Sequence, residues 1–361
     1  MEQNLFKISV TCMTYNHATF IKDAMNGFCI QQTDFPFVCC IVDDCSTDGE
    51  QDVIKEFLSE NFDLSNPTTR KEETEHYHLV FSRNKKNQNC YFAVFFLKYN
   101  HYQKKAKRHY LKEWLSNTEF HAICEGDDYW IDSLKLQKQV EFMESHPDYT
   151  LVCNRTQLFS EREHKAIGEN YCYNKSQTMD VRDVICKGGL FISTCSIVCR
   201  AHIKKYIPEY WLRCKIGDYP LQIMAAMKGK IYYFNELMSV YRVENSTSWM
   251  GKLKWTPENY DNRISIIKSV INMFKGFAAD YPQYADIFKT KIAHHISSHI
   301  PHRGKDPEIR KKYLNDFKKD IEEFPFLWKL DAWIGTSRIP LLARLRKWYY
   351  PPFKSNIKRY K

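Results

Sequence analysis

The first half of the chain alternates between short apolar runs and segments whose apolar residues recur at helical spacing. Strands are predicted at the apolar or β-branched runs, residues 6–13, 37–42, 77–81, 120–124 and 149–153. Helices are predicted at residues 20–28, 53–58 and 134–145, the second with a capping-box spacing at Thr47 and Glu50. Strands that alternate with helices across short connections pair in parallel. The pattern therefore predicts an α/β fold with a mostly parallel sheet flanked by helices.

The later part of the chain is less regular and ends in a helical region. Residues 84–117 are basic and aromatic, and they predict two helices. Further elements are expected as helices at residues 179–186 and 217–227 and as strands at residues 191–199, 231–234 and 238–241. From residue 257 to residue 333 the apolar spacing is helical throughout. We expect an α/β domain at residues 1–245, a mainly helical region at 246–336 and a tail at 337–361.

Composition places the chain among packed globular proteins. Of its 361 residues 43% are hydrophobic and 15% are aromatic, and only 12 are glycine. No apolar run approaches the length that crosses a bilayer, and no basic and apolar leader opens the sequence. The 13 cysteines are odd in number, scattered through apolar segments, and include no Cys-x-x-Cys pair. We therefore expect reduced thiols and a cytoplasmic protein.

The net charge of +10 is concentrated in the tail. Residues 338–361 hold eight basic residues and no acidic one, which leaves +2 for the remainder. Apolar and aromatic residues are interleaved with these basic ones, as in segments that lie on an anionic membrane surface. Nucleic acid is the competing partner for such a tail, but the nearly neutral body argues against it. We expect a peripheral contact of the tail with the inner face of the plasma membrane.

Polar residues cluster at the carboxyl ends of three predicted strands, the edge where open α/β sheets bind ligands. Residues 14–16 follow the first strand, Asp43 and Asp44 follow the second, and residues 125–128 follow a later one. The last cluster holds three carboxylates within four residues, and such acids stay ionised together when Mg²⁺ or Mn²⁺ lies among them. The alternative is a solvated acidic turn in which one aspartate caps the next helix.

Two common nucleotide-binding motifs are missing from the sequence. No Gly-x-Gly-x-x-Gly follows the first predicted strand, and no Gly-Lys-Ser/Thr loop is present. The sequence therefore supports neither dinucleotide-dependent oxidoreduction nor P-loop hydrolysis.

Three other motifs occur in order at predicted strand ends. They are Ile-Ser-Val-Thr-Cys-Met-Thr-Tyr-Asn at residues 8–16, Val-Asp-Asp-Cys-Ser-Thr-Asp-Gly at residues 42–49, and Cys-Glu-Gly-Asp-Asp-Tyr-Trp at residues 124–130. Together they resemble the family 2 glycosyltransferases of the GT-A fold. Lys-Leu-Gln-Lys-Gln at residues 135–139 is similar to the branch that builds bacterial cell-surface polysaccharides. The resemblance covers residues 8–242.

The resemblance implies a nucleotide-binding site at the ends of the first two strands. In the family, the acid after the second strand recognises the nucleotide base, which implies this role for Asp43, with Asp44 as its neighbour. The loop after the first strand wraps the base and the ribose, which implies Thr14, Tyr15 and Asn16. The expected donor is a nucleoside diphosphate sugar, with UDP as the expected nucleotide.

The resemblance also implies a metal site, because the family's Asp-x-Asp motif corresponds to Glu125-Gly126-Asp127. Asp127 is expected to bind Mg²⁺ or Mn²⁺, and Glu125 is a second ligand that replaces the family's first aspartate. Asp128 is expected to face the acceptor or to cap the following helix. Trp130 is expected to face the acceptor or to pack against the turn.

Two late segments complete the implied site. Asp218, after a glycine at a predicted helix start, resembles the family's late acidic motif and is implied as the catalytic base. Its alternative role is an ordinary helix N-cap. Arg242 is expected to offset diphosphate charge, whereas Glu244 stands where relatives often have a histidine and is a poorer phosphate partner. Residues 193–196 are expected to line the acceptor pocket or to form a close-packed strand.

These features together predict an inverting, metal-dependent glycosyltransferase that moves a sugar to a growing surface glycan or a lipid-linked acceptor. Its base would deprotonate the acceptor hydroxyl as that hydroxyl attacks the anomeric carbon from the face opposite the leaving diphosphate. Two alternatives stay open. A non-catalytic nucleotide- or glycan-binding protein would share the fold, and a sugar nucleotidyltransferase would release pyrophosphate instead of a nucleoside diphosphate.

Overall fold

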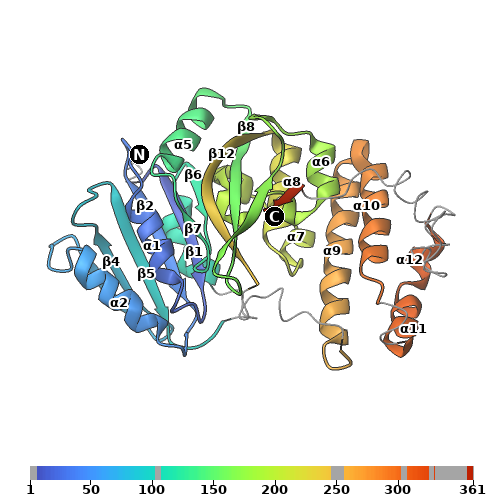
Figure 1. Ribbon diagram of the computed structural model, residues 1–361, viewed down its shortest axis with the longest axis horizontal. Helices are drawn as coiled ribbons and strands as arrows, with labels where there is room; N and C mark the ends of the chain where they lie inside the picture. The colour runs from blue at the N-terminus through green and yellow to red at the C-terminus, as the bar shows by residue number, and fades with distance from the viewer. Residues whose placement is uncertain are drawn as a thin grey trace.

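The computed structural model describes residues 6–101, 107–244, 256–301, 307–324, 329 and 356–360. They form a mixed β-sheet with helices on both faces, and a group of further helices lies beyond one end of the sheet (Figure 1).

Half of the sheet carries the three sequence motifs on parallel strands. In order across the sheet its strands are β6 (Phe120–Ile123), β1 (Ile8–Thr14), β2 (Phe37–Asp43), β5 (Cys90–Leu97), β4 (Tyr77–Arg83) and β3 (Arg70–Glu73). The first four are parallel to one another, whereas β4 and β3 run antiparallel at the edge. The predicted parallel core is confirmed.

The other half of the sheet is mixed. Its strands are β7 (Tyr129–Trp130), β8 (Tyr149–Ser160), β9 (Lys165–Tyr171), β10 (Gln177–Thr178), β11 (Val198–Arg200) and β12 (Lys230–Val243). Antiparallel β11 joins β6 to β8, and β12 runs parallel to β8. β12 also pairs with β7 and β10, while β9 pairs with β8. The two strands expected at 231–241 are one strand, β12, interrupted by register shifts.

Helices bury both faces of the parallel strands. They are α1 (Ile21–Cys29), α2 (Glu50–Asn61), α3 (Lys107–Tyr110), α4 (Lys112–Ser116) and α5 (Lys135–Ser145). Side chains of β2 alternate between two cores. Cys39 and Ile41 pack with α1, α2 and α5, whereas Cys40 and Val42 pack with Trp114 of α4. Because both of its faces are buried, the sequence of β2 is a continuous apolar run.

The helices later in the chain share hydrophobic cores with the sheet and with one another. They are α6 (Val181–Lys187), α7 (Glu209–Leu212), α8 (Asp218–Lys228), α9 (Tyr260–Asp280), α10 (Ala285–Ser298), α11 (Pro307–Asp316) and α12 (Lys318–Glu322). Phe274 of α9 and Phe288 of α10 share a core with Tyr219 of α8. A separate core joins α9 and α10 to α11 and α12. The helical C-terminal region therefore packs directly on the α/β domain (Figure 1).

Two predicted elements are wrong. Residues 90–97, assigned to a helical segment, form the buried strand β5, because periodicity cannot separate a strand buried on both faces from a buried helix. Most of the strand predicted at 191–199 is replaced by two 3₁₀ turns, Gly189–Phe191 and Thr194–Ser196. There the Ser196 hydroxyl donates to the Ser193 carbonyl at 2.6 Å, a local bond that competes with strand pairing.

The end of the chain joins the sheet. β13 (Asn356–Arg359) pairs antiparallel with β9, and the Tyr360 N–H donates to the Ile167 carbonyl at 2.7 Å. This part of the expected amphipathic tail is therefore a strand, and the rest of residues 337–361 lies outside the described residues. Among the helices that the structure describes, none is long and apolar enough to cross a membrane.

Candidate active site

The three polar clusters meet at one edge of the sheet. In the parallel register, Thr14 at the end of β1 lies beside Asp43 at the end of β2. On the other side of β1, the Gly126 N–H donates to the Met13 carbonyl at 3.0 Å, which places the turn after β6 against the same strand end. The prediction that these clusters lie together is confirmed.

Asp43 is a fully buried acid with one unsatisfied oxygen. Its Oδ2 accepts hydrogen bonds from the Ser46 N–H at 3.3 Å and from Gln51 Nε2 at 2.5 Å, whereas Oδ1 has no hydrogen-bond partner. Burial raises the pKa of Asp43, and these donors act in the opposite direction. Because buried acceptors are rarely left unpaired, Oδ1 is suited to receive an N–H from a ligand.

Asp44 belongs to the protein interior. Its N–H donates to the Thr14 carbonyl at 3.0 Å, and its Oδ1 accepts the His101 N–H at 2.7 Å. Its carboxylate therefore holds the segment after β5 against the end of β2.

The loop after β1 is fastened to the loop after β2. Asn16 adopts a left-handed conformation with φ 57°. Its N–H donates to Ser46 Oγ at 2.9 Å, and its Oδ1 accepts the Thr47 N–H at 2.8 Å. Tyr15, next to it, has 39% of its surface exposed. The loop thus presents one aromatic ring to solvent while its polar groups hold the backbone.

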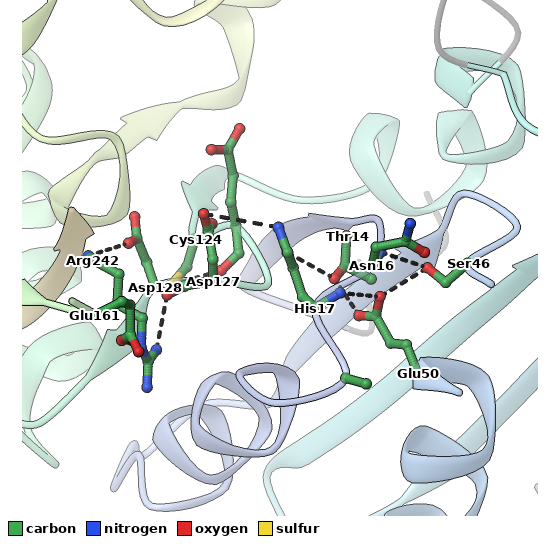
Figure 2. Close-up of polar contacts among 12 residues, drawn as sticks. Thr14, Asn16, His17, Ser46, Glu50, Cys124, Asp127, Asp128, Glu161 and Arg242 are labelled. Carbon is green, nitrogen blue, oxygen red and sulfur yellow. Dashed lines mark hydrogen bonds and ion pairs between the residues drawn. The ribbon is translucent and has the colours of Figure 1, made fainter. Parts of the chain in front are cut away.

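Glu50 joins these loops and was missed as a site residue. It is fully buried and accepts hydrogen bonds from Thr14 Oγ1, the His17 N–H at 2.9 Å and Ser46 Oγ at 2.8 Å (Figure 2). The expected capping box is wrong, because Gly49 is the N-cap of α2 and no side chain caps it. An acid at a helix start is common, so no sequence signal distinguished Glu50 from a cap.

The acidic turn, residues 125–128, packs tightly against β1. A Cβ on Gly126 would collide with Thr14, 2.6 Å from its Cβ, so a glycine is needed for this close approach. The Asp127 carboxylate is 17% exposed, and its Oδ2 lies 3.9 Å from His17 Nε2. The Glu125 side chain is exposed. Desolvation by neighbouring protein atoms, followed by the negative charges of Asp127 and Asp218, raises its pKa to about 8. Solvent at an exposed side chain screens part of this effect.

The remaining acid of the turn is internal. Asp128 is 1% exposed, its Oδ1 accepts the Arg242 N–H at 2.9 Å, and burial raises its pKa well above the ordinary value. Neither aspartate of the turn caps the next helix, because β7 follows the turn and Leu134 is the N-cap of α5. The alternative of a helix-capping acidic turn is therefore wrong.

Arg242 and Trp130 support the turn from behind. The Arg242 guanidinium donates to Glu161 Oε1 at 2.6 Å, to the Asp127 carbonyl at 2.8 Å and to Asp23. It would have to leave these partners to contact a phosphate, and that expected contact stays a prediction. Trp130 is buried, and its Nε1 donates to the Cys195 carbonyl at 2.8 Å.

Glu244 lies at the end of the described segment that contains β12. Its conformation is left-handed, with φ 62°. Its carboxylate accepts from Ser160 Oγ at 2.6 Å and pairs with Arg162 at 3.0 Å.

Asp218 begins α8. The N-cap of α8 is Gly217, so the ordinary N-cap role of Asp218 is wrong. Its Oδ1 accepts the Tyr219 N–H at 2.8 Å and its Oδ2 accepts from Thr194 Oγ1 at 3.3 Å. Burial raises the pKa of Asp218, and its own charge helps to raise the pKa of Glu125. The 3₁₀ turn at 194–196 thus orients an acid close to the turn.

The acidic turn fits a cation that is shared with a phosphate ligand. Within the described ranges, no three His, Cys, Asp or Glu side chains form a group that could hold a metal. Mg²⁺ and Mn²⁺ prefer oxygen ligands, and Mg²⁺ is usually bound by one or two carboxylates together with substrate phosphates and water. Asp127 and the exposed Glu125 supply that donor set.

Solved structures of S. aureus TarS have a similar fold. The S. aureus TarS 1–349 crystal structure in complex with UDP superposes with a TM-score of 0.57 at 17% identity, covering 94% of this chain and 87% of that one. A second crystal structure of TarS 1–349 gives a TM-score of 0.58 at 15% identity. The mixed sheet with flanking helices and a helical C-terminal region is the GT-A fold, as predicted.

Sequence comparisons give the family. Uncharacterised proteins of Mycobacterium tuberculosis and Mycobacterium bovis are 28% identical over 246 residues, which are 67% of this chain and 60% of theirs. The chain thus matches less than two thirds of the length of these relatives. The sequence model described as glycosyl transferase family 2 matches residues 9–207, more than half of the chain. The motifs, the fold and this match agree, and the chain belongs to glycosyl transferase family 2.

Proposed function

We propose that the chain transfers a sugar, with inversion, from a nucleoside diphosphate sugar to a surface glycan or a lipid-linked acceptor. The observation that carries the proposal is that Asp43 and the acidic turn meet at one sheet edge, with Asp218 near enough for its charge to raise the pKa of Glu125. These residues give one ligand a base-recognising acceptor, a diphosphate site and a nearby proton acceptor. Family membership supports the same activity.

Asp43 is the proposed base-recognising residue. Its unpartnered Oδ1 would accept a ring N–H of the nucleotide base. The exposed Tyr15 ring would lie along the base or the ribose. UDP is the favoured nucleotide because uracil offers a ring N–H, and because TarS, which shares the fold, was solved in complex with UDP.

Asp127 and Glu125 are the proposed ligands of Mg²⁺ or Mn²⁺. When bound, such a cation would neutralise charge on the leaving diphosphate. Arg242 holds the Asp127 backbone in place, so the turn keeps its shape.

Asp218 is the proposed catalytic base. It would take the proton of an acceptor hydroxyl while that oxygen forms a bond to the anomeric carbon. The bond from the anomeric carbon to the diphosphate oxygen breaks, and the nucleoside diphosphate leaves with the electron pair. Burial raises the pKa of Asp218, which makes its carboxylate a better proton acceptor than an ordinary aspartate.

A nucleotide screen with product analysis tests the proposal. We expect UDP or another nucleoside diphosphate to raise the melting temperature more with Mn²⁺ than without it. Incubation with the matching nucleotide sugar should release the nucleoside diphosphate. A nucleotidyltransferase would instead form pyrophosphate from a nucleoside triphosphate, and a non-catalytic binding protein would release nothing. Either result would contradict the proposal.

A further inference from the structure

Glu50 is a buried carboxylate whose role the proposed reaction does not explain. Its side chain has no exposed surface, yet it receives three hydrogen bonds from residues outside its own helix. Within the described part of the chain, no lysine, arginine or histidine forms an ion pair with it. Burial of a charge is costly, and here donated hydrogen bonds and the first turn of α2 offset that cost.

Two of the residues that donate hydrogen bonds to Glu50 also lie against the acidic turn. Thr14, whose hydroxyl donates to Glu50, also packs against Gly126 so closely that no side chain fits there. His17 donates its N–H to Glu50, and its ring Nε2 lies 3.9 Å from Asp127 Oδ2 (Figure 2). Its Nδ1 is 3.2 Å from Thr14 Oγ1. Both neighbours of the turn are thus held by one carboxylate.

Asp43, the proposed base-recognising residue, is not oriented by the same carboxylate. Asp43 is oriented by the Ser46 N–H and by Gln51 Nε2, and neither of these groups contacts the Glu50 side chain. Of the three hydrogen bonds to Glu50, only the one from the Ser46 hydroxyl comes from the loop that orients Asp43, whereas the other two come from the end of β1 and the segment after it. Loss of Glu50 should therefore affect the two halves of the site unequally.

We propose that Glu50 is a positioning residue, which holds Thr14 and His17 and thereby sets the place of the acidic turn for metal and diphosphate binding. This inference rests on the proposed function of that turn. A glutamine is a poor replacement, because its amide is uncharged and offers one acceptor oxygen where the carboxylate offers two. The group that faces the amide nitrogen would lose its bond to an acceptor or, if it is a hydroxyl, would have to accept instead of donate.

Glu50→Gln is the test variant, and Asp52→Asn is its matched control. Asp52 is an exposed acid two residues later whose side chain pairs with Lys55, so its variant removes the same charge from the first turn of α2 without touching the donors to Glu50. Calorimetric titration gives the Kd for Mn²⁺ alone, for UDP with Mn²⁺, and for uridine without metal. Uridine reports the base-recognising side because it carries no phosphate.

Glu50→Gln should raise the Kd for Mn²⁺ and for UDP with Mn²⁺ more than about fivefold, as expected for lost charge-assisted hydrogen bonds. It should change the Kd for uridine less than about threefold, and Asp52→Asn should leave all three Kd values within that limit. A smaller effect of Glu50→Gln on the Kd for Mn²⁺ and for UDP, or an equal effect on the Kd for uridine, would overturn the inference. So would an Asp52→Asn variant with the same effects as Glu50→Gln.

A second variant keeps the inference testable if Glu50→Gln does not fold. Thr14→Val retains the shape that packs against Gly126 but lacks the hydroxyl that donates to Glu50. This variant should weaken the binding of Mn²⁺ and UDP more than the binding of uridine. Equal losses of affinity for all three would overturn the inference. A wild-type chain that binds Mn²⁺ but no nucleoside diphosphate would overturn the proposed function, while the Mn²⁺ titrations would still decide the role of Glu50. Binding of neither would overturn both.

Discussion

The acids of the site differ in environment, and this difference separates their roles. Asp43 has an unused oxygen, Asp44 is fully engaged with the segment after β5, and Asp127 is partly open to solvent. Glu50 and Asp128 are buried, with their carboxylates bonded to neighbouring loops or strands. Environment, rather than residue type, therefore suggests which carboxylate meets a ligand.

Asp218→Asn should lower the rate of sugar release or transfer by about 10²- to 10⁴-fold, the usual contribution of a general base. Uridine binding should be retained, because the Asp218 carboxylate bonds to Tyr219 and Thr194, and neither of them orients Asp43. A turnover assay with the matching nucleotide sugar and a uridine titration measure the two effects.

The pH dependence of the rate provides the control for that variant. Protonated Asp218 cannot accept a proton, so the rate should fall as pH drops through its pKa. Because burial raises this pKa, the fall in rate on the acid side of the pH–rate profile, its acid limb, should lie above pH 3.8, the ordinary aspartate pKa. The limb should be absent from the residual activity of Asp218→Asn, and an unchanged limb would contradict the assignment.

Asp43→Asn and Asp44→Asn form a matched pair. Asp43→Asn should weaken uridine binding by about tenfold, because a charge-assisted hydrogen bond to the base is lost. Asp44→Asn should mainly lower the melting temperature, because Asp44 holds the His101 N–H. Calorimetry and thermal unfolding distinguish them, and the reverse order of effects would refute both roles.

At the scale of elements, Arg242 on β12 joins parts of the fold that are distant in sequence. It bonds to Asp23 of α1, to Glu161 after β8 and to the acidic turn, and its guanidinium lies 4.5 Å from the Tyr129 ring centroid. These contacts connect both halves of the sheet behind the site.

Arg242→Met should therefore lower the free energy of unfolding by about 3 kcal/mol, because it leaves a partly buried carboxylate unpaired. Urea denaturation measures the change. The control is Arg213→Ala, whose pairing with Glu209 is exposed, and its effect should stay below about 1 kcal/mol. Equal effects of the two variants would show that the buried pair contributes no more than a surface pair.

Element prediction succeeded where one face or one spacing dominated and failed where burial was complete. The strands β1, β2 and β6 were expected close to their observed bounds, because each ends in an abrupt polar cluster. β5 lacks such an ending and lies buried between β2 and β4, so its apolar run was read within a helical segment. The 3₁₀ turn that orients Asp218 depends on local hydroxyl bonds that the sequence pattern did not reveal.

At the scale of the whole molecule, the basic tail is the expected membrane contact. Changing Arg344, Arg346 and Lys347 to serine alters no residue of β13. The change should weaken binding to anionic vesicles by about a hundredfold, because each charge contributes about 1 kcal/mol. Flotation with anionic and neutral vesicles measures this. Lys311, Lys318 and Lys319, exposed on or near α11 and α12, supply a control of equal charge. Equal flotation of wild type and tail variant would remove the membrane contact.

The sequence by itself determined the parallel core, the three motif ends and the family, because short-range patterns and motif order are encoded locally. Tertiary structure decided which acids are free, since partners such as His101 for Asp44 come from distant segments. It also brought Asp218 near enough to Glu125 for its charge to raise the pKa of that residue, and revealed Glu50 as the acid that holds Thr14 and His17. Burial and hydrogen-bond partners depend on packing between elements, and no local pattern specifies them.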